Sequence, residues 1–169
     1  MKKKPSASSK KGMYVAIAIG FVIIGSVIGI SYSAEQAKIS GQRFGTNLEQ
    51  IQDDLKNEVS DYESKLSSWH EGKITKQEML QISDAHLAKL ENALSRYQTL
   101  IPPTSFESSL ELFKRSTETQ LESDRLLKEW IETGDNSTKI RSDELIQQSF
   151  EYETSALDSF NMAKKQNTP

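Results

Sequence analysis

An uncharged, apolar segment near the N-terminus constrains this chain more than any other feature. No charged residue occurs between residues 12 and 34, and residues 13–30 are almost wholly apolar. Because a helix rises about 1.5 Å per residue, this stretch is long enough to cross the ~30 Å hydrocarbon core of a bilayer. The sequence therefore predicts a transmembrane helix over residues 13–33, with the lipid bilayer as a partner.

The flanking charges predict the orientation of this helix. Residues 1–12 contain five lysines and no acidic residue. Such a basic tail stays in the cytoplasm, so residues 34–169 are expected outside the cell membrane. A signal peptide cleaved near Ser33, releasing a secreted domain, is the alternative, but the apolar stretch exceeds the usual length of about 7–15 residues. With only residues 1–12 before the helix, a signalling protein of this design would act through a separate membrane partner.

Small residues recur at every fourth position through the apolar segment and beyond it. This spacing lets two helix backbones approach closely, so it predicts an association ridge and a homodimer. The alternative is the ordinary glycine content of membrane helices. The ridge comprises Gly25, Gly29, Ser33, Ala37, Gly41 and Gly45.

The composition of the remaining chain excludes several functions. Without residues 1–12 the chain has 16 basic and 24 acidic residues, a net charge of −8, so it would repel nucleic acid. There is no cysteine, which excludes disulfides, thiolate metal sites and cysteine nucleophiles.

Apolar residues recur at helical spacing in four segments, at about 44–70, 75–101, 104–133 and 138–164. Because the connections between them are short, consecutive helices are expected to be antiparallel neighbours. The predicted fold class is all-α: a transmembrane helix that continues through a helical stalk at 34–43 into an up-down-up-down antiparallel four-helix bundle at 44–165. Residues 166–169 form a tail.

Local signals predict where these helices begin and end. Capping boxes are predicted at Thr75–Glu78 and at Thr104–Glu107, and helix stops at Gly72 and Gly134. The expected inward residues of the second helix are Leu80, Leu87, Leu90, Leu94, Tyr97 and Ile101, and those of the fourth are Ile146, Phe150, Leu157 and Phe160.

A Leu-Ile-Pro-Pro turn at residues 100–103, an amphipathic helix and a Gly-Asp loop at 134–135 follow one another. This pattern resembles uncharacterised membrane-anchored or secreted helical-bundle domains over about residues 90–160. The resemblance implies a fold and no activity.

Polar residues at inward positions are the candidate binding site. Helical phase places Asp124 near the centre of an apolar face, where a carboxylate needs a donor such as Tyr62 or Ser83, or water. A small polar pocket between helices is one interpretation, and a polar layer that fixes helix register is the other. The candidate pocket residues are Tyr62, Ser83, Thr117, Gln120, Asp124 and Glu153.

The remaining motifs do not indicate a catalytic, cofactor-binding or metal-binding function. His70 and His86 lack the spacing of di-iron or zinc motifs, so no metal, cofactor-binding or catalytic residue is predicted. Trp69 and Trp130 are expected at the end of the bundle far from the membrane, as a recognition patch or as the closure of the core. Asn136 begins an N-glycosylation sequon and is also a candidate helix cap.

The sequence favours a non-enzymatic interaction module that binds an unidentified membrane or extracytoplasmic protein, or itself. The alternative is a ligand-binding sensor domain of the chemoreceptor type. An enzyme would require Asp124, Glu153 or His86 to meet in one pocket.

Overall fold

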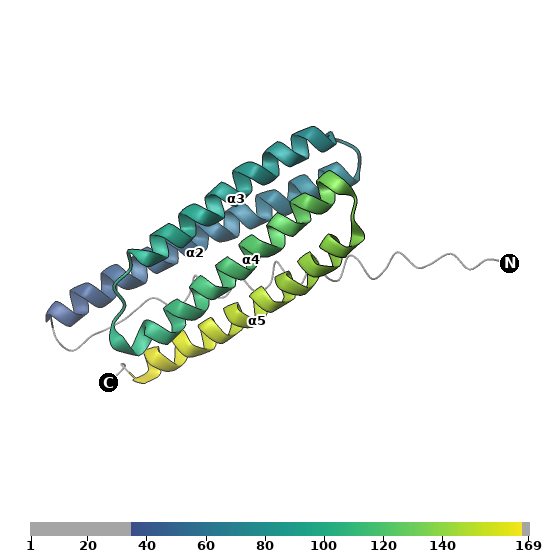
Figure 1. Ribbon diagram of the computed structural model, residues 1–169. Coiled ribbons are helices and arrows are strands. Elements are labelled where there is room, and N and C mark those ends of the chain that lie inside the picture. The colour runs from purple at the N-terminus through teal and green to yellow at the C-terminus, as the bar shows by residue number, and fades with distance from the viewer. Residues whose placement is uncertain (1–34, 167–169) are drawn as a thin grey trace.

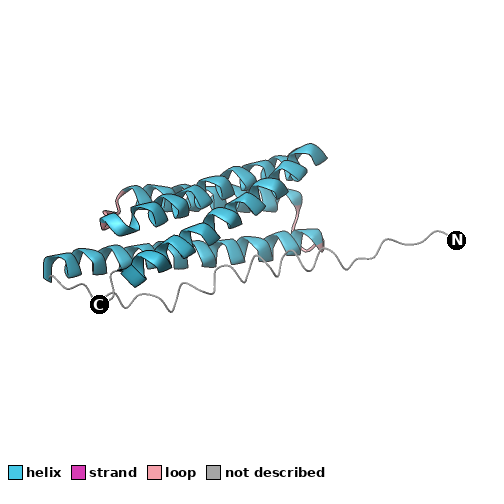
Figure 2. Cartoon of the chain, turned by 90° about the horizontal axis from the view of Figure 1, so that it is seen from below, coloured by secondary structure: helices cyan, strands magenta, loops and turns pink. Residues whose placement is uncertain are grey.

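The computed structural model describes residues 35–166, and these form an all-helical bundle with no strand (Figures 1 and 2). The prediction of an all-α fold is confirmed. The helices are α2 (Glu35–His70), α3 (Lys76–Gln98), α4 (Glu107–Thr133) and α5 (Asn136–Gln166), with a 3₁₀ turn, η2, at Thr104–Phe106.

Side-chain contacts show that α2 and α3 run in opposite directions, as do α4 and α5. Between α2 and α3, Tyr62 bonds Ser83 while the earlier Asp54 bonds the later Arg96. Between α4 and α5, Ser116 bonds Ser149 while the later Ser123 bonds the earlier Ser142. The connections after α2 and α4 lie at one end of the bundle, and the connection after α3 lies at the other (Figure 1).

Local chemistry explains most of the helix ends. Gly72 and Gly134 follow their helices with φ of 73° and 78°, a left-handed conformation that side chains with a Cβ disfavour. At the start of α3 the capping box is complete: Thr75 Oγ1 accepts from the Glu78 amide, and Glu78 accepts from the Thr75 amide.

The capping box predicted at Thr104–Glu107 is wrong. Residues 104–106 form the 3₁₀ turn, and α4 begins at Glu107 without a side-chain cap at Phe106. Pro103 holds the extended backbone before the turn, and the Phe106 amide donates to the Pro103 carbonyl at 2.8 Å. The turn fully buries the Phe106 ring, which packs between Phe44 and Phe160.

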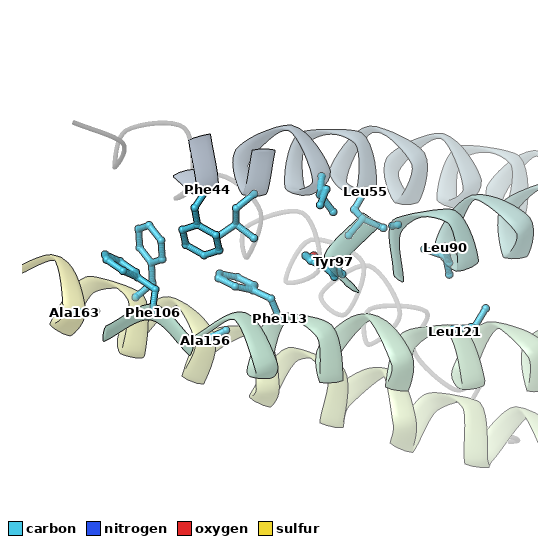
Figure 3. Close-up of a cluster of buried hydrophobic side chains, with 13 residues drawn as sticks. Phe44, Leu55, Leu90, Tyr97, Phe106, Phe113, Leu121, Ala156 and Ala163 are labelled. Carbon is cyan, nitrogen blue, oxygen red and sulfur yellow. The ribbon is translucent and has the colours of Figure 1, made fainter. Parts of the chain in front are cut away.

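The apolar core has two parts. The larger lies toward the α3–α4 connection and is built around the aromatic rings of Phe44, Phe106 and Phe113 (Figure 3). Phe160 belongs to the same cluster. The smaller lies near the opposite end, where Tyr62, Met79 and Ile131 are buried. Polar side chains lie between these two clusters.

Two predicted apolar faces are displaced. On α3 the most deeply buried side chains are Met79, Ser83, His86, Leu90, Ala93 and Tyr97, while Leu80, Leu87 and Leu94 are half-buried. Ile101, expected inside, lies after the end of α3 and is 84% exposed. The buried faces differ from the predicted ones because small and polar side chains occupy the positions nearest the neighbouring helices. A prediction from apolar residues alone takes no account of these side chains.

The seam between α4 and α5 shows the same effect most clearly. Small buried residues repeat every seven positions: Ser109, Ser116 and Ser123 on α4, and Ser142, Ser149, Ala156 and Ala163 on α5. Ser116 and Ser149 each donate from Oγ to the other's carbonyl at 2.9 Å, and Ser123 donates to the Ser142 carbonyl at 2.8 Å. Ile146, Phe150 and Leu157, predicted inward, are therefore displaced to the half-buried flank of α5.

Among the helices of residues 35–166, none is both long and apolar enough to cross a membrane. The predicted transmembrane helix at 13–33 lies outside the described residues, as do Gly25, Gly29 and Ser33 of the association ridge. Ala37, Gly41 and Gly45 belong to α2, and the two glycines are buried. The transmembrane helix and the ridge stay predictions.

Candidate functional site

A buried histidine joins three helices at the centre of the bundle. His86 of α3 is 1% exposed. Its Nδ1 lies 3.0 Å from the Glu58 carboxylate of α2, and its Nε2 lies 3.0 Å from the Asp124 carboxylate of α4. The ring also stacks on Tyr62 of α2, with centroids 3.9 Å apart and planes within 3°.

This geometry favours the positively charged imidazolium. Both partners are carboxylates, which accept hydrogen bonds when ionised, so both ring nitrogens of His86 must donate. Burial alone would lower the pKa of His86, but the bonds and charges of Asp124 and Glu58 outweigh it and raise that pKa. Burial also raises the pKa of Asp124, and His86 opposes this effect. Since both ring nitrogens of His86 donate, we assign His86 as an imidazolium and Asp124 as a carboxylate.

The expected donor to Asp124 was Tyr62 or Ser83, and the structure assigns different groups. His86 donates to Asp124, and Gln120 is its second side-chain partner. Tyr62 instead bonds Ser83 at 2.9 Å, and the Ser83 hydroxyl lies 2.9 Å from the Met79 carbonyl. Ser83 therefore orients Tyr62 rather than facing the carboxylate.

A second polar group lies around Tyr97 of α3. Its hydroxyl accepts a hydrogen bond from Gln52 of α2 and has a further side-chain hydrogen bond with Thr117 of α4. Burial raises the pKa of Tyr97 above its usual range, so the phenol stays neutral. Thr117 thus belongs to a structural contact between α3 and α4.

A cavity of about 90 Å³ opens between α2, α4 and α5 beside the His86 network. Four of the six predicted pocket residues line it, namely Tyr62, Gln120, Asp124 and Glu153, while Ser83 and Thr117 do not. Apolar lining comes from Val59, Leu66, Leu127, Ile146 and Phe150. The cavity therefore combines apolar walls with a few polar groups, as small-ligand sites do.

Glu153 is the most unusual residue of this cavity. Its side chain is buried, with 5% of the residue exposed, and its Oε1 atom has no hydrogen-bond partner in the part of the chain that the structure describes. Burial raises the pKa of Glu153 from 4.5 to about 7. Burial, and then the charge of Asp124, raise the pKa of Glu63 to about 7 as well. Two acids of the cavity therefore change charge near neutral pH.

The sequence pattern gives no structural role to three features of this region. It relates His86 only to metal or catalytic chemistry, and it does not point to Glu63 or to the α4–α5 serines. The serines carry a detectable signal, because small residues spaced by seven on two helices indicate a close seam. For His86 the signal was its phase, three residues after Ser83 and four before Leu90 on the buried face.

Other candidate residues do not form a site of this kind. In the described part of the chain no group of His, Asp and Glu side chains is arranged to hold a metal ion. Trp69 and Trp130 pack edge to face, 5.6 Å apart, against the smaller core cluster and close its end. Asn136 is exposed but does not cap α5, since Asp135 accepts from the Ser137 amide at 2.8 Å. Its glycosylation stays a prediction.

No protein-family model, no curated protein and no solved structure matches this chain.

Proposed function

We propose that this chain is a non-enzymatic binding protein whose ligand site is the cavity between α2, α4 and α5. In this proposal the transmembrane helix at 13–33 holds an up-down-up-down antiparallel bundle outside the cell membrane, and ligand binding is passed to a second copy or to another membrane protein. It combines a sensor-type site with a protein-interaction module.

The observation that carries the proposal is the buried Glu153 carboxylate, one oxygen of which lacks a hydrogen-bond partner among the described residues. Leaving a buried polar group unsatisfied costs about 1–3 kcal/mol, and more for a charged group. A bundle that served only as a spacer would be more stable with an apolar residue there. The carboxylate is therefore explained best by a bound molecule that satisfies it.

The same geometry argues against catalysis by His86. Both of its ring nitrogens are used by carboxylates, so the ring has no free nitrogen to accept a proton from a substrate. Its side chain does not line the cavity. The Glu58–His86–Asp124 network instead holds three helices together and positions Asp124 at the cavity wall.

The test is ligand-observed NMR on the full chain in detergent micelles, with a library of small fragments of every charge class. Ile146, which lines the cavity, would be replaced by Trp to fill it. Ile140→Trp is the matched control, because Ile140 lies on the same helix and is 61% exposed. Fragments that bind wild type and Ile140→Trp but not Ile146→Trp support the proposal. Binding that survives in Ile146→Trp, or no binding at all, contradicts it.

A further inference from the structure

The cavity between α2, α4 and α5 carries more negative charge than its surroundings neutralise. Four carboxyl groups line it, from Glu63, Asp124, Asp143 and Glu153. His86 neutralises Asp124 from the α3 side of the bundle. Lys139 also lines the cavity, but it is paired with Asp143 four residues later. Glu63 and Glu153 are the two lining carboxyl groups that form no ion pair with a residue of the described range 35–166.

Glu153 distinguishes this group from an ordinary acidic surface. Only 5% of it is exposed, it lines the cavity, and its Oε1 atom has no hydrogen-bond partner within residues 35–166. A carboxylate oxygen can only accept hydrogen bonds, so the missing partner must be a donor. A positively charged donor would supply both the hydrogen bond and the missing countercharge.

The remaining lining limits the size and character of that donor. An engineered apolar cavity of about 150 Å³ holds benzene, so a cavity of about 90 Å³ suits a smaller molecule. Apolar side chains also line the cavity, with Leu127, Ile146 and Phe150 among them. A molecule that matches both kinds of lining has a cationic group and a short hydrocarbon group.

We propose that the cavity binds a small organic ammonium ion, a protonated amine with a short alkyl group, with Glu153 accepting a hydrogen bond from the ammonium. This inference rests on the proposed function and specifies the chemical class of its ligand. The ammonium replaces the solvent that Glu153 has lost, and the alkyl group covers the apolar wall.

The experiment is isothermal titration calorimetry at pH 8 on the full chain in detergent micelles. The probes are propylammonium chloride, 1-propanol and sodium propionate, which share a short carbon chain and differ in charge, with sodium chloride and magnesium chloride as salt controls. The variants are Glu153→Gln and, as a matched control, Glu151→Gln, because Glu151 lies on the same helix and is exposed. Circular dichroism verifies that each variant is helical.

We expect one propylammonium ion per chain, bound at least tenfold more tightly than any other probe. Glu153→Gln should weaken this binding at least tenfold, and Glu151→Gln should leave it unchanged. Equal binding of propanol or propionate, abolished by Ile146→Trp, would overturn the ammonium assignment and leave the cavity as a ligand site. Preference for magnesium, or ammonium binding unaffected by Glu153→Gln, would also overturn it. If neither these probes nor any member of the fragment library binds to the protein, the ammonium assignment and the proposed function are both refuted.

Discussion

The pH dependence of stability should reveal the buried charge of Glu153. Its pKa is about 7 in the folded chain, against 4.5 for an ordinary glutamate. The unfolded chain therefore loses this proton at a lower pH than the folded chain. Between those two values the folded state binds more protons, so stability falls as pH rises, and the loss is complete above about pH 7.

The size of this effect follows from the shift. Each pKa unit corresponds to about 1.4 kcal/mol, so Glu153 should cost about 3 kcal/mol of unfolding free energy between pH 4.5 and pH 8. The neutral side chain in Glu153→Gln removes that dependence. At pH 8 the variant should be more stable than wild type by up to about 3 kcal/mol, or roughly 10 °C in melting temperature for a bundle of this size.

The assay is urea unfolding of the full chain in micelles, followed by circular dichroism from pH 4.5 to pH 8.5. Glu151→Gln should follow the wild-type curve throughout. Glu63 contributes in the same direction in all three proteins, but it is less buried than Glu153 and its effect is smaller. The reasoning is refuted if wild type and Glu153→Gln keep a constant stability difference over this range, since Glu153 then titrates as it does in the unfolded chain.

Four further substitutions test the framework around the site, each by urea unfolding at pH 7. His86→Ala should lower the unfolding free energy by about 3–5 kcal/mol because it leaves buried carboxylates unpaired. The double variant with Asp124→Ala should lose less than the sum of the two single losses, and strict additivity would contradict the network. Ser116→Leu should cost about 2 kcal/mol by overpacking the α4–α5 seam, against about 1 kcal/mol for Ser116→Ala, and equal losses would exclude close packing there. Gly134→Ala should cost about 1 kcal/mol from its φ of 78° alone, since a Cβ at this position would meet only open space; an unchanged midpoint would show that the turn relaxes. Thr75→Ala should cost about 1 kcal/mol by removing the cap of α3, and no loss would mean that Glu78 alone suffices.

Helix ends were predictable wherever a local signal decides them. Gly72 and Gly134 end their helices because their left-handed φ values strain any residue with a Cβ. Thr75 starts α3 because its side chain and that of Glu78 satisfy amides within the same turn. The box at Thr104 failed because burial of the Phe106 ring, a contact with residues far along the chain, determines the local backbone.

The candidate site was predictable in part. Helical phase alone brought Tyr62, Gln120, Asp124 and Glu153 to inward positions, and all four line the cavity. Phase gives the direction of a side chain from its own helix but not the group that it meets. The donor to Asp124 therefore depended on how α3 is rotated against α4, which the sequence does not specify.

The sequence by itself determined four amphipathic helices, most of their ends and the inward direction of Tyr62, Gln120, Asp124 and Glu153, because these depend on interactions within a few residues of the chain. Only the tertiary structure decided that serines, rather than leucines, form the α4–α5 seam. It also decided that His86 bridges two carboxylates and that Glu153 is left facing a cavity. These features depend on the rotation and separation of whole helices, which the packing of all their side chains sets together.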